Sequence, residues 1–300
     1  MKNILLIGAA CMALAACSTV DDLMGGDDAA AKAAEAAAAN SAKLAAVLEA
    51  QDDDAKARYQ YRNPQATLEF FGIEPGMTVV DSLPGKVWYA GILSDYLGPK
   101  GKVIGVDYSM EMWPLFGGFA TEEWLAKRAD WKSTWLADMA EGVDADDAPV
   151  DAFVYGSLPE DMHGTADAVL MVRAAHHFNR FEDEGGFFTQ ALTDVSNVLK
   201  DGGTLGIVQH RAPEGNSDEA SEGDNGYVKQ SRIITFVEAA GFELVESSEI
   251  NANPKDAPSD SDIVWRLPPT LGTSRDNEEL RAEMQAIGES DRMTLKFRKQ

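Results

Sequence analysis

The chain has 300 residues, of which 45% are apolar, and this is enough for one large α/β domain with appendages. It carries 50 acidic and 26 basic side chains, which give a formal net charge of −24. Nucleic-acid binding requires a basic surface, so this balance excludes nucleic acid as a partner and leaves solubility as the role of the scattered acids.

The N-terminal segment has the features of an export signal. Lys2 supplies a positive charge, Ile4–Ala15 is apolar, and the segment ends in Leu14-Ala15-Ala16-Cys17. The apolar run is too short to span a bilayer. The four final residues match the lipobox of bacterial lipoproteins, which implies that residues 1–16 are removed as a signal peptide and that Cys17 is lipidated.

The lipobox also implies a location. Ser18 after the lipidated cysteine resembles lipoproteins of Gram-negative bacteria that are sent to the outer membrane. We therefore expect a cell-envelope protein at that membrane, facing the periplasm and held by acyl chains such as palmitate alone, since no later stretch approaches about 18 apolar residues. Cys11 lies in the discarded segment, so the mature chain can form neither an internal disulfide nor a Cys-ligated zinc site.

Residues 17–57 are predicted to form an Ala-rich tether. The composition is mainly Ala, Asp, Glu and Lys, and alanine favours a helix. Large apolar residues are too few for a core. Leu44, Val47 and Leu48 have helical spacing, which leaves open the alternative that this part packs on the domain as a helix.

The domain itself is expected at residues 58–300. Asn63 followed by Pro64 predicts a helix N-cap, and the helix runs over Gln65–Phe71 and ends at Gly72. Three side chains just before this helix are expected to pack against the domain or, alternatively, to cover a cofactor site as a lid: Tyr59, Tyr61 and Arg62.

Residues 77–93, MTVVDSLPGKVWYAGIL, organise the domain. A strand over Met77–Val80 ends at Asp81, a turn containing Pro84 and Gly85 follows, and a helix is predicted over Trp88–Leu97. A strand, a Gly-containing turn and a helix form the first βα unit of nucleotide-binding α/β folds. The free N–H groups of the helix N-terminus and the close approach allowed by the turn serve the ligand there.

The rest of the domain alternates strands and helices. A second strand, Lys102–Val106, ends at Asp107, where such folds bind a ribose diol. Met110–Trp135 is amphipathic and rich in Trp and Met, which predicts helices that cover one face of the sheet. The remaining strands are predicted at Val150–Tyr155, Ala168–Val172, Thr204–Gln209, Phe242–Ile250 and Met293–Lys299. Helices are predicted through Leu192 to a stop at Asp201-Gly202-Gly203 and over Val228–Ala240. A polar insertion, residues 251–290, contains a further predicted helix over Asn277–Ile287.

Two adjacent histidines follow the fourth strand. His176 and His177 are candidate catalytic bases, because imidazole titrates near neutral pH. The alternative is that one histidine caps the strand and the other points to solvent. No metal site is expected from these two together with His163 and His210, since neighbouring side chains on an extended segment point to opposite sides.

Several motifs occur in a characteristic order: Arg62-Asn-Pro-Gln-Ala-Thr-Leu-Glu-Phe-Phe-Gly72, Asp81 with Pro84-Gly85 and Trp88-Tyr89, Ala166–Leu170 with His176-His177, Leu199–Gly203 with His210-Arg211, and Leu295–Lys299. Together they resemble class I S-adenosylmethionine-dependent methyltransferases, in a bacterial branch with a Pro-Gly first motif. The resemblance implies a Rossmann-like α/β fold. Its seven-stranded mixed sheet would have the order 3-2-1-4-5-7-6, an antiparallel last strand, and helices on both faces.

The resemblance also implies site residues for the cofactor S-adenosyl-L-methionine. The methionine part would lie against Asp81, Pro84 and Gly85, the ribose against Asp107, and the adenine against Gly156, Ser157 and Leu158. The segment Arg173–His177 would face the methyl group and the acceptor. The chain departs from the family at Lys86 and Val87, where glycines are usual, and Gly156-Ser157 lacks the acid that often receives the adenine amino group.

Two functions follow from these observations. The first is methyl transfer to a small-molecule or lipid-like acceptor in the cell envelope. The alternative is a catalytically silent relative that binds a ligand or an envelope partner through the same cleft. Lys86 and Val87 favour the alternative, and so does the location, because S-adenosylmethionine is made in the cytoplasm and a charged molecule does not cross hydrocarbon unaided.

Overall fold

The computed structural model describes residues 20–300 except residue 86. The predicted signal peptide and Cys17 lie outside these residues. Internal contacts divide the chain into two units, one up to Ala42 and one from Lys43 to Gln300, whereas the sequence placed the start of the domain at residue 58. In the described part of the chain, no helix combines the length and the apolar character that crossing a bilayer requires.

The last turns of the N-terminal helix belong to the domain. This helix, α1, spans Val20–Ala50, and its Leu44 and Leu48 are buried in a cluster that also contains Ile92 of the helix after the first strand. Lys43 donates a hydrogen bond to the carbonyl of Tyr96 over 2.7 Å. The alternative of a packed helix therefore holds for this part of the predicted tether.

The centre of the domain is a mixed sheet with the strand order β3-β2-β1-β4-β5-β8-β7. The pairs from β3 to β5 are parallel, and β8 is antiparallel to both of its neighbours. The described chain has one strand more than predicted, because β6 precedes the last two and pairs with β5. The strands are β1 (Thr78–Ser82), β2 (Lys102–Asp107), β3 (Val150–Val154), β4 (Ala166–Val172), β5 (Leu199–Ala212), β6 (Val228–Lys229), β7 (Phe242–Ser248) and β8 (Arg292–Lys299).

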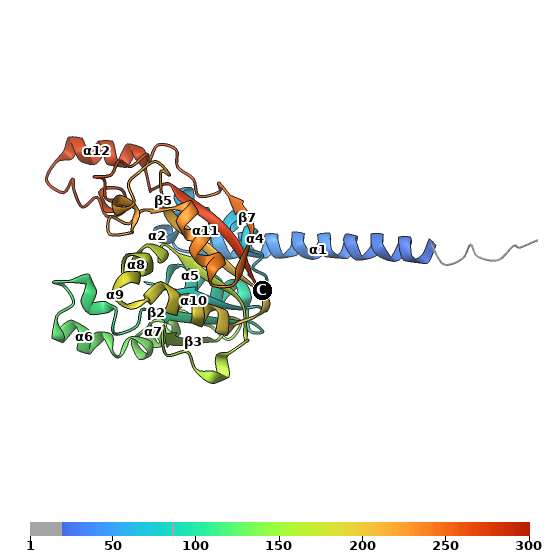
Figure 1. Ribbon diagram of the computed structural model, residues 1–300. Helices are drawn as coiled ribbons and strands as arrows, with labels where there is room; N and C mark the ends of the chain where they lie inside the picture. Colours follow the sequence, from blue (N-terminus) through green and yellow to red (C-terminus); the bar gives the residue numbers. More distant parts are fainter. Residues whose placement is uncertain (1–19, 86) are drawn as a thin grey trace, which may run out of the picture. The chain divides into compact units, whose positions relative to one another are not determined.

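Helices cover both faces of this sheet (Figure 1). Successive strand residues point to opposite faces, so Val79 and Val80 lie in different apolar clusters. One face packs against α4 (Pro64–Phe71), α5 (Trp88–Leu97) and α7 (Trp131–Ala140), and the other against α8 (Ala175–Arg180), α10 (Phe187–Val198) and α11 (Gln230–Ala239). The short helices are α2 (Asp53–Lys56), α3 (Tyr59–Arg62), α6 (Glu122–Arg128) and α9 (Glu182–Gly185), and α12 spans Glu278–Ile287.

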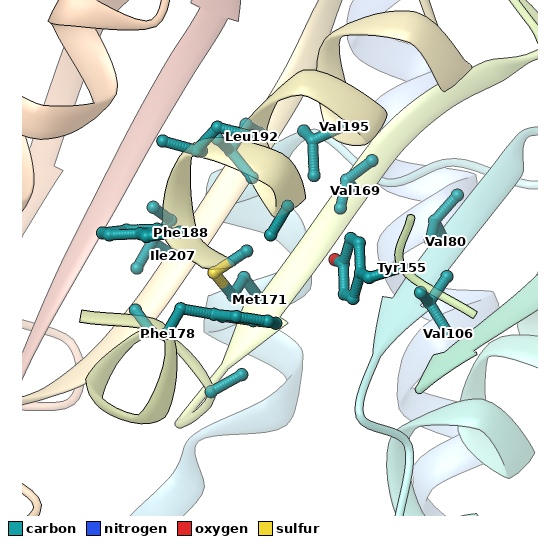
Figure 2. Close-up of a cluster of buried hydrophobic side chains, with 14 of the residues drawn as sticks. Val80, Val106, Tyr155, Val169, Met171, Phe178, Phe188, Leu192, Val195 and Ile207 are labelled. Carbon is teal, nitrogen blue, oxygen red and sulfur yellow. The ribbon is translucent and has the colours of Figure 1, made fainter. Parts of the chain in front are cut away.

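Figure 2 shows the core on the α10 side of the sheet. Met171 and Ile207 project from β4 and β5 toward Phe178 of α8 and Phe188 of α10, and all four are buried. Removing such side chains from water is the main stabilising contribution, about 25 cal/mol for each Å² of apolar surface. The packing fixes the carboxyl ends of the central strands, where ligands bind in folds of this type.

Two glycines let aromatic rings reach the backbone of the sheet on the opposite face. A Cβ atom at Gly105 of β2 would lie 2.8 Å from the ring of Trp135, which comes from α7. A Cβ atom at Gly206 of β5 would lie equally close, 2.8 Å, to the ring of Phe71 from α4. Real Cβ atoms do not approach so closely, so both helices sit nearer to the sheet than any other residue at these positions would allow.

Three local predictions are corrected by tertiary contacts. Asn63 precedes α4 but does not cap it, because its backbone is left-handed and its side chain donates to the carbonyl of Ile250 over 2.8 Å. Helix α10 ends at Val198 and β5 begins at the next residue, so Asp201-Gly202-Gly203 lies in a strand. Residues 110–135 cover both faces rather than one, since Trp113 and Trp135 belong to different clusters.

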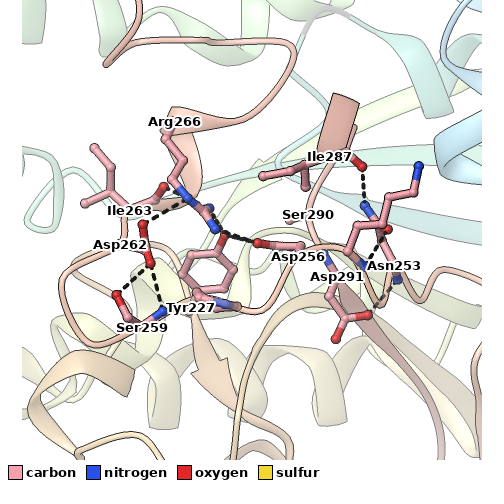
Figure 3. A network of polar contacts seen from close by, with 12 residues as sticks. Tyr227, Asn253, Asp256, Ser259, Asp262, Ile263, Arg266, Ile287, Ser290 and Asp291 are labelled. Atoms are coloured by element: carbon pink, nitrogen blue, oxygen red, sulfur yellow. Dashed lines mark hydrogen bonds and ion pairs between the residues drawn. The ribbon is translucent and has the colours of Figure 1, made fainter. Parts of the chain in front are cut away.

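The insertion after β7 is held by a buried polar network (Figure 3). The Asp256 carboxylate pairs with Arg266 at 2.8 Å, accepts a hydrogen bond from the Tyr227 hydroxyl at 3.0 Å, and accepts another from the backbone N–H of Asp291 at 2.8 Å. The predicted helix is confirmed as α12, with the Asn277 side chain as its N-cap. The insertion is therefore an ordered part of the domain.

Candidate active site

A cavity of about 340 Å³ lies at the carboxyl ends of β1, β2, β4 and β5. The strand order reverses between β1 and β4, and doubly wound sheets bind their ligands in the crevice at that point. The volume is in the range of small-molecule pockets. The cavity is lined by Leu83, Pro84, Gly85, Asp107, Tyr108, Trp113, Arg128, Trp131, Val172, Arg173, His176, His177, His210 and Trp265.

The turn after β1 forms one wall. Pro84 and Gly85 line the cavity as predicted, and Leu83, Gly85 and Val87 all have left-handed backbones, with φ of 59°, 58° and 53°. Only glycine adopts the left-handed region of φ/ψ space without a cost in conformational energy, and a β-branched residue such as Val87 is an outlier there. Backbone strain of this kind occurs at ligand sites held in place by their surroundings. Lys86 lies outside the described residues.

Asp81 is buried beside this turn without lining the cavity. Only 3% of it is exposed, and its Oδ2 has no hydrogen-bond partner. Burial raises the pKa of Asp81 to about 7, although Arg173 and a backbone hydrogen bond from Ala90 act in the opposite direction. The carboxyl group is therefore partly protonated at neutral pH, and an approaching cation would favour its ionised form.

Asp107 lines the cavity but already has a cationic partner. Arg128, the last residue of α6, donates to its Oδ1 over 2.6 Å, and burial nevertheless raises the pKa of the carboxyl group. The guanidinium carbon lies 4.5 Å from the ring centre of Trp113 and 5.7 Å and 5.8 Å from those of Trp124 and Trp131. Cation–π contacts and a charge-assisted hydrogen bond thus hold Arg128 on the predicted ribose acceptor.

The stretch predicted to line the adenine does not reach the cavity, as Gly156, Ser157 and Leu158 are absent from its wall. The side chain of Tyr155 lies instead in the core, with its hydroxyl 2.8 Å from the Ser82 hydroxyl. Asp194 of α10 accepts a hydrogen bond from the backbone N–H of Gly156 over 2.6 Å. Asp194 therefore holds the backbone of this stretch and does not reach the cavity.

His176 and His177 both line the cavity, but from helix α8 rather than from an extended segment. Their ring centres are 3.9 Å apart, so the expectation that they point to opposite sides is wrong. Burial lowers the pKa of His176 to about 4 and that of His177 well below its usual value. Both are neutral at pH 7, and burial makes them weaker bases than a histidine in water.

Each ring is oriented by a neighbour. The Nδ1 of His176 lies 3.2 Å from the side-chain oxygen of Gln209, and the Nδ1 of His177 is hydrogen-bonded to the Tyr108 hydroxyl. The Nδ1 of His210 lies 2.6 Å from the Ser290 hydroxyl. Within residues 20–300, Lys86 excepted, no three His, Cys, Asp or Glu side chains are placed to hold a metal ion.

Among the lining residues that were not predicted from the sequence, Arg128 and Trp265 come from outside the predicted motifs. Arg128 is the last residue of the short helix α6, and nothing near it in the sequence indicates that it pairs with Asp107. Trp265 comes from the insertion, and its ring centre is 6.2 Å from that of His176. A tryptophan in an otherwise polar segment is the one signal that pointed to burial at that position.

The solved structures similar to this chain include S-adenosylmethionine-dependent methyltransferases, some crystallised with the cofactor or its demethylated product. One from Aquifex aeolicus is 20% identical, with 69% of this chain and 93% of the other covered at a TM-score of 0.43. Geranyl diphosphate C-methyltransferase from Streptomyces coelicolor is 12% identical, with coverage of 81% and 80% at 0.48. A Haemonchus contortus phosphoethanolamine N-methyltransferase is 15% identical, with coverage of 79% and 52% at 0.45.

No family model matches the chain, and no curated protein matches it either. A functional assignment therefore has to come from the residues of the cavity.

Proposed function

We propose that the chain is an S-adenosylmethionine-dependent methyltransferase that acts on a small-molecule or lipid-like acceptor. The observation that carries the proposal is the composition of one cavity at the β1/β4 switch point. Its walls combine the Pro84-Gly85 turn and the Asp107 carboxylate on the nucleotide side with His176 and His177 on the other. The resemblance in the sequence assigns cofactor contacts to three of these residues, and a single cavity brings all five together.

The residues of the site fit the proposed cofactor in part. The turn presents a backbone without a side chain at Gly85, and the buried Oδ2 of Asp81 lacks the partner that a cationic amino group would provide. Asp107 fits only if Arg128 shares its carboxylate or moves away. When bound, the sulfonium cofactor supplies an electrophilic methyl group.

The chain's own contribution to the reaction would be alignment and exclusion of water. The Nδ1 of His177 is hydrogen-bonded to the Tyr108 hydroxyl, and in the tautomer whose Nδ1–H donates to that oxygen, the other ring nitrogen carries no proton and can receive one from the acceptor. Because the ring is neutral at pH 7, it can take that proton from a hydroxyl or amine acceptor in the transition state.

The second candidate function is a catalytically silent relative that binds a ligand through the same cavity. Arg128 favours it, because an arginine on the ribose acceptor competes with the nucleotide. The proposed location also favours a silent relative, since a lipoprotein of the cell envelope would work outside the cytoplasm, where S-adenosylmethionine is made. We propose further that Cys17 carries the lipid anchor, which rests on the sequence alone.

Titration calorimetry of the full chain with S-adenosylmethionine and S-adenosylhomocysteine separates the two functions. We expect detectable but weak binding. Arg128→Met should tighten it roughly tenfold, because the diol gains a free carboxylate, and Asp107→Asn should weaken it by a similar factor. Lys127→Met is the matched control, since Lys127 is an exposed neighbour that pairs only with Glu123 at 2.8 Å.

Absence of binding at millimolar concentration in both the wild type and Arg128→Met would overturn the methyltransferase proposal. The silent relative would then remain.

A further inference from the structure

Arg173, at the start of the segment that carries the two histidines, is a charged residue of the cavity that has no part in the proposed reaction. Its side chain lines the cavity, and its backbone is left-handed, with φ of 59°. Its Nε is fully buried and has no hydrogen-bond partner. Among residues 20–85 and 87–300, no group accepts a hydrogen bond from its guanidinium or forms an ion pair with it.

The nearby charges explain why Arg173 is left without a partner. Three other arginines share the one carboxylate of Glu289, which is 4% exposed. Arg58 binds its Oε1, and Arg62 and Arg292 approach its Oε2 at 3.5 Å and 3.3 Å. Glu289 makes no ion pair with Arg173, so three guanidinium groups share its carboxylate and the fourth has no part of it.

The buried Nε of Arg173 is costly, because it has lost the hydrogen bonds of water and gained none, although the residue as a whole is only half-buried. Surplus positive charge is also unusual in a chain whose formal net charge is −24. Asp81 does not supply the missing partner, since its free oxygen makes no hydrogen bond to Arg173. An anionic group entering the cavity would complete the hydrogen bonds of Arg173 and offset the surplus charge.

We propose that Arg173 binds an oxyanion, a carboxylate or a phosphoryl group, carried by the acceptor molecule. The acceptor assignment rests on the proposed function, whereas the anion site does not. Arg173 lies three residues before His176 in the chain, and both line the same cavity. Trp265 and the neutral rings of His176 and His210 provide apolar and aromatic surface for the rest of such a molecule.

Arginine suits this role because its planar group donates two parallel hydrogen bonds to a carboxylate or phosphate. Arg128, the other arginine of the cavity wall, is already paired with Asp107. Among the described residues of the wall, Arg173 is therefore the cation that remains available to an anion.

The test titrates the full chain with sodium phosphate and with sodium acetate at constant ionic strength, followed by calorimetry. The two probes distinguish a phosphoryl from a carboxylate site. We expect saturable binding of at least one probe, weakened at least tenfold by Arg173→Met and only partly by Arg173→Lys. Arg298→Met, which removes an exposed arginine of β8, should leave the affinity unchanged.

Circular dichroism of each variant confirms that it is folded, and the lysine variant keeps the test decisive if the methionine variant unfolds. The proposal is overturned if neither probe saturates the wild type, or if Arg173→Met binds as the wild type does.

Parallel titration with S-adenosylhomocysteine separates the two proposals. Nucleotide binding without anion binding overturns the anion site alone, and anion binding without nucleotide binding overturns the methyltransferase alone. If phosphate and S-adenosylhomocysteine each prevent the other from binding, Arg173 binds the carboxylate of the cofactor. This result would overturn the proposal that the anion belongs to the acceptor molecule.

Discussion

Asp81 shows how one residue can be prepared for a ligand at the expense of stability. Its carboxyl group is buried at the end of β1, and one oxygen has no partner. An ionised carboxylate in such a place has lost its hydration, so the neutral form is favoured in the folded state. The unfolded chain has no such preference, and the difference makes stability depend on pH.

We expect Asp81→Asn to stabilise the protein above neutral pH. Burial raises the pKa of Asp81 from 3.8 to about 7, so between these values the folded chain binds more protons than the unfolded chain. Stability therefore falls as pH rises from about 4 to about 7, by roughly 4 kcal/mol at most. The variant removes this loss, which urea unfolding at pH 5 and pH 8 measures. Asp276→Asn, at an exposed position, is the control, and an equal effect of Asp81→Asn at both pH values would contradict the account.

At the scale of an element, the insertion of residues 251–290 depends on few polar contacts. Asp256 is fully buried as a side chain and joins Arg266, Tyr227 and the backbone of Asp291, immediately before β8. Trp265 of the cavity wall lies next to Arg266 in the chain. The network therefore fixes one side of the candidate active site to the last strand of the sheet.

Replacing Asp256 with Ala should destabilise the domain by about 3 kcal/mol, because Arg266 would keep a buried charge with one partner fewer. Asp262→Ala is the matched control. Asp262 also pairs with Arg266, at 3.1 Å, but its side chain is 34% exposed, and such pairs contribute less than about 1 kcal/mol. Thermal unfolding compares the two variants, and limited proteolysis should cut the insertion first in Asp256→Ala. Equal costs for both substitutions would contradict the buried pair as the anchor.

At the scale of the whole molecule, the proposed anchor decides where the chemistry takes place. Cys17→Ser should release the protein from the membrane fraction or block removal of the signal peptide, because the serine cannot carry the lipid. Cys11→Ser is the matched control, since that cysteine lies in the segment proposed to be discarded. Cell fractionation followed by detection of the protein measures the effect. If Cys17→Ser stays with the membrane like the wild type, the anchor lies elsewhere.

The positions of the main strands could be predicted because buried parallel strands are continuous apolar runs with turn residues between them, whereas their order in the sheet was implied by the family resemblance. Strand β6 was missed, since its two residues are ordered by pairing with β5 and carry no periodicity. Of the residues predicted to bind the cofactor, Pro84, Gly85 and Asp107 line one cavity, and their binding role stays a prediction. The pairing of Arg128 with Asp107 could not be predicted, because it depends on how a separate helix packs.

The two glycines under aromatic rings also constrain how this sequence can change over evolutionary time. Gly105 cannot gain a side chain while Trp135 keeps its indole, and Gly206 cannot do so while Phe71 keeps its ring. Each glycine and its ring therefore form a unit in which a tolerated substitution at one position requires a compensating one at the other. Divergent copies of this chain should keep or lose each pair jointly, so a set of related sequences would show these positions varying together.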